Sequence, residues 1–290
     1  MRAVMFCRLN IIHDIRTGKI PAVFVMSFFL VRFFFSGFGN YLVAYGQKIQ
    51  AVELFSFSLT SPVTYLFFFF GMMILLSGNP RIEGDTLYYL IRSKRVIWLI
   101  GQYLYVLFCV IAYLSWLLFC YASAVKWQVV FSKNWSEPIY FVSQTGVVQN
   151  VGIGINVWFP YELLLNYSPY SLFFTIFLLQ ILLFFLLGAI QINLTIFGHP
   201  QLAYVLIVLL WLQAFVFQQF DVKPVFWKLS LVLQSWPAFW NYGYLKGAPK
   251  LNEVLGIYII TGSLLVILSK IQVGSFDMTG RELKGRERDV

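Results

Sequence analysis

The chain has 290 residues, of which 60% are hydrophobic and only 11% are charged. Soluble globular proteins carry about 25% charged residues, so a chain of this length could not cover its apolar surface with polar side chains in water. The net charge of +9 does not indicate a nucleic-acid binder, because the Lys and Arg residues stand in short segments beside apolar stretches and form no single basic patch. The composition predicts an all-α integral membrane protein.

Residues 1–19 precede the first long apolar stretch, and their pattern predicts a helix that lies in the membrane interface. Apolar residues recur at near-helical spacing, with charged residues between them. The apolar residues are Val4, Met5, Leu9, Ile11, Ile12 and Ile15, and the charged ones are Arg8, Asp14, Arg16 and Lys19. The alternative interpretation is a frayed tail.

Six stretches are apolar enough to cross a membrane, since a helical span needs about 20 mostly apolar residues at 1.5 Å rise per residue. They are residues 20–38, 60–76, 96–121, 171–197, 202–220 and 254–268. Residues 269–290 form a C-terminal tail.

The junction between the fourth and fifth stretches is Gly198-His199-Pro200-Gln201. Glycine ends helices and proline begins them, so this junction predicts a tight helical hairpin.

Arg32 stands inside the first span, where a charge at the bilayer centre costs about 2.5–3.5 kcal/mol on insertion scales. One interpretation is that its side chain faces a polar pathway or a subunit interface. The other is that the residue lies off-centre and its long side chain reaches outward to the headgroups.

The segment between the second and third spans holds a dense group of charges. Asn79-Pro80 and the nearby glycines end the preceding helix, and a short apolar stripe follows. The charged residues around this stripe are Glu83, Asp85, Arg92, Lys94 and Arg95. The segment is either a charged turn that binds a soluble partner or an ordinary loop that obeys the positive-inside rule.

Two long segments that fall on the opposite side, residues 122–170 and 221–253, are rich in Trp and Tyr, which favour the headgroup level. In the second of them, residues 226–233 are apolar but too short to cross, and Pro237 interrupts the sequence. We therefore expect a pair of half-buried, re-entrant helices between the fifth and sixth spans, because non-helical backbone at membrane depth has to be buried in protein.

An even number of spans places both termini on one side of the membrane. Of the basic residues outside the spans, thirteen fall on the side of the termini and seven on the other. The positive-inside rule then predicts a plasma-membrane protein with both termini in the cytoplasm.

The sequence holds no motif for catalysis or metal binding. Its three cysteines have no metal or redox spacing, and neither H-E-x-x-H nor G-x-S-x-G occurs. A phosphate-binding loop of the type G-x-x-x-x-G-K-[ST] is also absent. We expect no enzymatic activity, no metal and no cofactor. A secondary transporter would need charged residues inside its spans and an internal repeat, and Arg32 is the only charge well inside a span.

A short motif leads into the third span: Glu83-Gly84-Asp85, then Leu90-Ile91-Arg92-Ser93-Lys94-Arg95, then Trp98-Leu99-Ile100-Gly101-Gln102. It is similar to the corresponding stretch of Gram-positive ABC-2-type transporter permeases. The expected topology resembles that family along nearly the whole chain, whereas the motif covers only residues 83–102. The outer segment 122–170 is longer than in many members.

The resemblance implies two permease subunits, identical or related, that pair in the lipid membrane and bind a cytoplasmic dimer of ATP-binding subunits. ATP is bound by those partners, and the permease moves an amphipathic substrate outward, such as a peptide, an antibiotic or a lipid-linked molecule. The residues that this resemblance assigns to coupling are Glu83, Asp85, Tyr88, Tyr89, Arg92, Lys94 and Arg95. The alternatives are a non-transporting receptor or immunity protein, a secondary transporter and a membrane-embedded enzyme.

Overall fold

The computed structural model of the chain describes residues 2–81, 94–145, 160–220, 223–240 and 247–275. Its long helices are α1 (Arg2–Arg16), α2 (Lys19–Ala44), α4 (Pro62–Leu76), α6 (Arg95–Ala124), α9 (Pro169–Ile196), α10 (Pro200–Gln219) and α12 (Leu251–Ser275). Its shorter helical elements are α3 (Ala51–Ser58), α7 (Glu137–Thr145), α8 (Tyr161–Asn166), η2 (Pro224–Leu229), α11 (Leu231–Gln234) and η3 (Pro237–Phe239).

Five of these helices are long and apolar enough to cross a membrane: α2, α6, α9, α10 and α12. A sixth candidate is the pair α3 and α4, whose axes meet at 92°. The protein is thus a multi-pass helical membrane protein. The span expected at residues 254–268 was too short, because the helix runs from Leu251 to Ser275 and includes Glu253 and Lys270.

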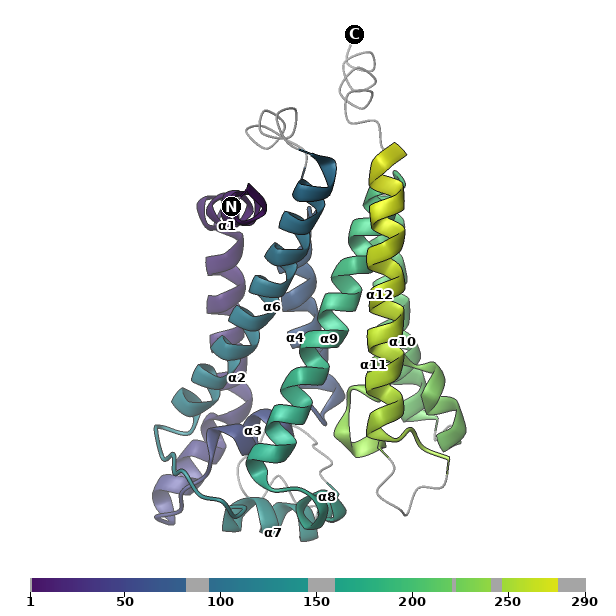
Figure 1. Cartoon of the computed structure of the whole chain (residues 1–290). Coiled ribbons are helices and arrows are strands. Elements are labelled where there is room, and N and C mark those ends of the chain that lie inside the picture. The colour runs from purple at the N-terminus through teal and green to yellow at the C-terminus, as the bar shows by residue number, and fades with distance from the viewer. Residues whose placement is uncertain (1, 82–93, 146–159, 221–222, 241–246, 276–290) are drawn as a thin grey trace.

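The helices form one bundle in which α6 and α9 are central (Figure 1). α6 packs against α1, α2 and α9, and α9 packs against α10 and α12. α1 lies crosswise to α2 at one end of the bundle, where α6 begins and α12 ends, and α7 and α8 lie at the other (Figure 1). We call these the α1 end and the α7 end.

The predicted hairpin between the fourth and fifth spans is confirmed. α9 ends at Ile196 and α10 begins at Pro200. Gly198 adopts a φ of +93°, which a residue with a side chain rarely adopts, and this lets the chain reverse within three residues. The two helices then pack against each other along the bundle.

α1 is a helix whose buried face carries both apolar and polar side chains. The residues buried against the bundle are Phe6, Asn10 and Asp14, whereas Val4 and Ile15 are 62% and 52% exposed. Asp14 is buried, whereas the basic residues of α1 are exposed beside Val4 and Ile15; these are Arg2, Arg8, His13 and Arg16. An exposed face that carries both apolar and basic side chains is typical of a helix at a membrane interface.

The second aromatic segment at the α7 end, within residues 223–240, differs from its prediction. The expected pair of re-entrant helices is replaced by three short helical elements, η2, α11 and η3. They are nonetheless packed into protein: Trp236 and Trp240 are fully buried, and the indole of Trp240 donates to the Gln234 carbonyl oxygen at 2.8 Å. Short turns suffice here because side chains and neighbouring helices satisfy the backbone groups.

The crossing of α1 over α6 depends on Gly101. A Cβ atom at this position would lie 2.6 Å from Cβ of Phe6 and 2.9 Å from the carbonyl oxygen of Ala3. Replacing Gly101 with Ala forces α1 away from α6, and we expect a loss of about 1–3 kcal/mol in unfolding free energy. Denaturation in detergent measures it. Gly256→Ala is the matched control, because a Cβ there meets nothing within 4 Å; equal losses in both variants would contradict the packing argument.

Candidate functional site

The strongest candidate site begins at the tight junction between α1 and α2. Gly18 has a φ of +76°, and its N–H donates to the Ile15 carbonyl oxygen at 3.1 Å, which ends α1 and turns the chain. This turn places Asp14, in the last turn of α1, beside Lys19, the first residue of α2. The local sequence thereby places an acidic and a basic side chain at the start of the first span.

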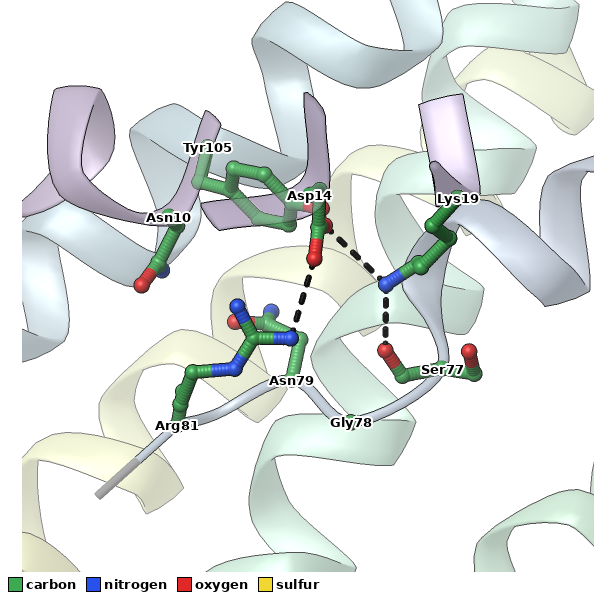
Figure 2. Close-up of a pocket in the computed structure, with 8 residues that line it drawn as sticks. All are labelled: Asn10, Asp14, Lys19, Ser77, Gly78, Asn79, Arg81 and Tyr105. Atoms are coloured by element: carbon green, nitrogen blue, oxygen red, sulfur yellow. Dashed lines mark hydrogen bonds and ion pairs between the residues drawn. The ribbon is translucent and has the colours of Figure 1, made fainter. Parts of the chain in front are cut away.

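One buried carboxylate joins three parts of the chain. Asp14 is 1% exposed, and its Oδ2 lies 3.0 Å from Nζ of Lys19 while its Oδ1 lies 2.9 Å from Nη2 of Arg81. The hydroxyl of Tyr105 on α6 also donates to the carboxylate. Figure 2 shows the carboxylate between the Lys19 and Arg81 side chains. We call Asp14, Lys19, Arg81 and Tyr105 the Asp14 centre.

The Asp14 centre stays ionised at neutral pH. Burial alone would raise the pKa of the Asp14 carboxyl, but the bond from Tyr105 and the charges of Lys19 and Arg81 outweigh it and hold the pKa below its ordinary value. One negative and two positive charges therefore share the centre.

The turn that follows α4, residues 76–81, is held from several helices. Lys19 donates to the Ser77 carbonyl oxygen at 2.6 Å, as Figure 2 shows, and Gln191 of α9 donates to the Leu76 carbonyl oxygen at 2.9 Å. Tyr204 of α10 accepts the Gly78 N–H at 3.1 Å. Because these bonds come from both halves of the bundle, residues 76–81 cannot shift without moving α2, α9 or α10.

Only a small hollow lies beside the Asp14 centre among the described residues. Several buried polar atoms nearby have no hydrogen-bond partner among the described residues, namely Asn10 Oδ1, Asn79 Oδ1 and Arg81 Nη1. Within the described residues no group of three His, Cys, Asp or Glu could hold a metal. The arrangement ties the end of α1 to the start of α2, to α6 and to residues 76–81.

Most residues predicted for coupling lie outside the described residues: Glu83, Asp85, Tyr88, Tyr89 and Arg92. The two that are described lie at the start of α6. Lys94 precedes the helix and is exposed, and Nη1 of Arg95 donates to the Gly274 carbonyl oxygen of α12 at 2.9 Å.

Arg32 is exposed on α2 and far from the Asp14 centre. Its Nη1 donates to Oγ of Ser123 at 3.4 Å, near the end of α6. The structure therefore does not bring Arg32 together with Lys94 or Arg95, the two coupling residues that it describes.

Sequence reasoning missed the Asp14 centre. Asp14 is the only acidic residue before Glu53, and it stands among basic residues on an amphipathic segment. A buried carboxylate is almost always paired, but the sequence does not show which carboxylates are buried.

A second buried carboxylate, Glu53, lies at the α7 end. It accepts the Ser136 N–H at 2.8 Å and the Ser136 hydroxyl at 2.6 Å, and it also bonds to Gln50. Glu53 thereby fastens the start of α7 to α3. The two buried acids hold opposite ends of the bundle.

Comparison of the chain with protein-family models, with curated proteins and with solved structures found no match in any of the three.

Asp14→Asn tests the centre. Removing the carboxylate charge leaves Lys19 and Arg81 partly buried without a counter-charge, and we expect a loss of about 3 kcal/mol in unfolding free energy. Thermal unfolding in detergent measures it. Glu253→Gln is the control, because the Lys228–Glu253 pair is about 40% exposed on each side and is screened by water. Equal effects of the two substitutions would contradict the role assigned to Asp14.

The depressed pKa of Asp14 predicts a pH dependence with a definite sign. A carboxyl with a lower pKa in the folded state stabilises the fold above its unfolded pKa of about 3.9. This stabilisation is lost as the pH falls through the folded-state pKa. The melting temperature of the wild type should exceed that of Asp14→Asn by a constant margin between about pH 5 and 7, and the margin should shrink below about pH 4. A margin that does not change with pH would refute this.

Proposed function

We propose that this chain is the membrane-spanning subunit of an exporter that is driven by a separate ATPase. The observation that carries the proposal is the fixation of residues 76–81, which lead directly into residues 82–93. A partner that moves residues 82–93 pulls on a turn that is bonded to helices on both sides of the bundle.

The residues on both sides of segment 82–93 are bonded to the helix bundle. On the entering side, Arg81 is paired with the buried Asp14 and accepts from the indole of Trp98 at 3.4 Å through its carbonyl oxygen. On the leaving side, Arg95 is bonded to Gly274 at the end of α12. A displacement of the segment therefore reaches α1 and α2 through Asp14, and α12 through Arg95.

The distribution of positive charge supports a cytoplasmic position for the α1 end in the plasma membrane. The described basic residues there include most of the arginines; they are Arg2, Arg8, Arg16, Lys19, Arg81, Lys94, Arg95 and Lys270. Outside the spans, the described basic residues at the α7 end are all lysines; they are Lys48, Lys126, Lys133, Lys223, Lys228 and Lys250. Positive residues close to span ends favour the cytoplasmic side.

In this arrangement α1 lies in the inner interface with Val4 and Ile15 toward lipid. α3 and α4 together form the second of six spans, and residues 224–240 dip back into the membrane from the outer side. Two such subunits, identical or related, pair and move an amphipathic molecule outward. A cytoplasmic pair of ATP-binding subunits supplies the energy through residues 82–95.

Copurification of the ATPase tests the proposal. The test variant carries Glu83→Lys, Asp85→Lys and Arg92→Glu. In mild detergent the amount of ATPase that copurifies with it should fall at least about tenfold below the wild-type amount, because opposite charges in the contact become like charges. Membrane insertion should be unchanged.

The matched control carries three reversals at the α7 end, Lys133→Glu, Glu137→Lys and Lys250→Glu, all on exposed residues. It should retain the ATPase as well as the wild type does. If the inner triple variant keeps its ATPase, or if the wild type copurifies with none, the proposed function is wrong.

A further inference from the structure

Arg32 lies in an open groove on the outward side of α2. The groove has a volume of about 650 Å³, and its lining residues are Phe28, Phe29, Leu30, Arg32, Phe33 and Ser36. Phe29 and Phe33 are 65% and 78% exposed. A single guanidinium thus stands in an apolar surface that faces away from the bundle.

The described partners of this guanidinium are neutral. Nη1 donates to Oγ of Ser123 at 3.4 Å, and the guanidinium carbon lies 5.9 Å from the ring centroid of Phe28. Among the described residues no carboxylate forms an ion pair with Arg32. A guanidinium carries five N–H donors, so its charge and most of its donors are left to the surroundings.

The depth of the Arg32 guanidinium in the membrane indicates what surrounds it. α1, which we place in the inner interface, lies against α6 at Gly101 and is bonded to Tyr105. From Tyr105 to Ser123 an α-helix rises about 27 Å, close to the hydrocarbon thickness of about 30 Å. Ser123, and with it the guanidinium, therefore lies at the headgroup level of the leaflet at the α7 end. Trp127, which is 61% exposed, marks the same level.

We propose that Arg32 binds the phosphate of an anionic phospholipid in this leaflet, with an acyl chain of the lipid lying along Phe29 and Phe33. The pairing is chemically complementary, because a guanidinium donates two parallel, charge-assisted hydrogen bonds to a phosphate. The apolar lining of the groove matches the chain that follows the headgroup.

A second copy of the chain is a poorer occupant of the groove. In a symmetric pair joined through this face, the same patch contributes from both sides. Each Arg32 would then approach the other, and like charges across an interface are unfavourable. A phospholipid supplies the missing negative charge without such repulsion.

Lipid binding to the purified full chain tests the proposal. Native mass spectrometry in neutral detergent would count adducts of phosphatidylglycerol, of phosphatidylcholine and of diacylglycerol with the same acyl chains. We expect phosphatidylglycerol to bind most tightly and diacylglycerol hardly at all. Arg32→Gln should weaken phosphatidylglycerol binding about tenfold, the scale of one charge-assisted hydrogen bond. Arg32→Lys should fall between, because an ammonium lacks the planar fork, and Lys133→Gln should bind as the wild type does.

Several outcomes would overturn the proposal. They are unchanged binding in Arg32→Gln, equal binding of diacylglycerol, and displacement of the lipid by excess inorganic phosphate, which would make this a site for a free anion. If Arg32→Gln does not fold, a phosphatidylglycerol with a photoreactive acyl chain, used on the wild type, should label residues 28–36; labelling confined to other helices refutes the site.

Disulfide crosslinking of a Phe33→Cys chain to itself in membranes would show a second copy in the groove, which is also a refutation. None of these results depends on the ATPase, so failure of the lipid site and failure of the proposed function are separate outcomes.

Discussion

A carboxylate buried at the end of an apolar helix bundle has to be paired, and the pairing of Asp14 sets the architecture of the α1 end. Its two oxygens reach Lys19 and Arg81, and a hydroxyl from α6 completes the set. Each partner belongs to a different part of the chain, so one charge fixes the angle of α1, the start of α2 and the turn after α4. Breaking such a pair from one side is costly, so the carboxylate holds these parts of the chain together.

The opposite end is fastened by different means. Glu53 is satisfied by four donors from Gln50 and Ser136 and has no ion pair among the described residues, and Trp236 and Trp240 fill the space beside α11. The two ends also differ in their exposed cations. Under the proposed function, the α1 end is the side on which an ATPase would act.

The sequence alone located the spans and the hairpin well, because both follow from local rules. About 20 apolar residues are needed to cross hydrocarbon, and Gly198 and Pro200 mark a helix reversal without any knowledge of the fold. The last span was cut short at its charged residues, although a helix continues past the hydrocarbon wherever its ends reach the headgroups. The burial of Asp14 on α1 could not be predicted, because an amphipathic pattern shows that two faces exist but not which residues meet protein when lipid is the solvent.

The Asp14 centre could not be predicted, because its members are brought together only by the fold. Arg81 and Tyr105 stand 67 and 91 residues from Asp14. No local spacing connects them. Five of the coupling residues chosen from the motif lie outside the described part of the chain, so their role stays a prediction, and the structure instead explains how the turn before them is held.

The most direct test of the central claim is a double-mutant cycle on Asp14 and Arg81. Unfolding free energies would be measured in detergent for the wild type, Asp14→Asn, Arg81→Gln and the double variant. If Asp14 ties residues 76–81 to α1 through Arg81, the double variant loses less than the sum of the single losses, with a coupling of about 1–3 kcal/mol. Strictly additive losses would show that the two side chains act independently, and the link from residues 76–81 to α1 through Asp14 would be refuted.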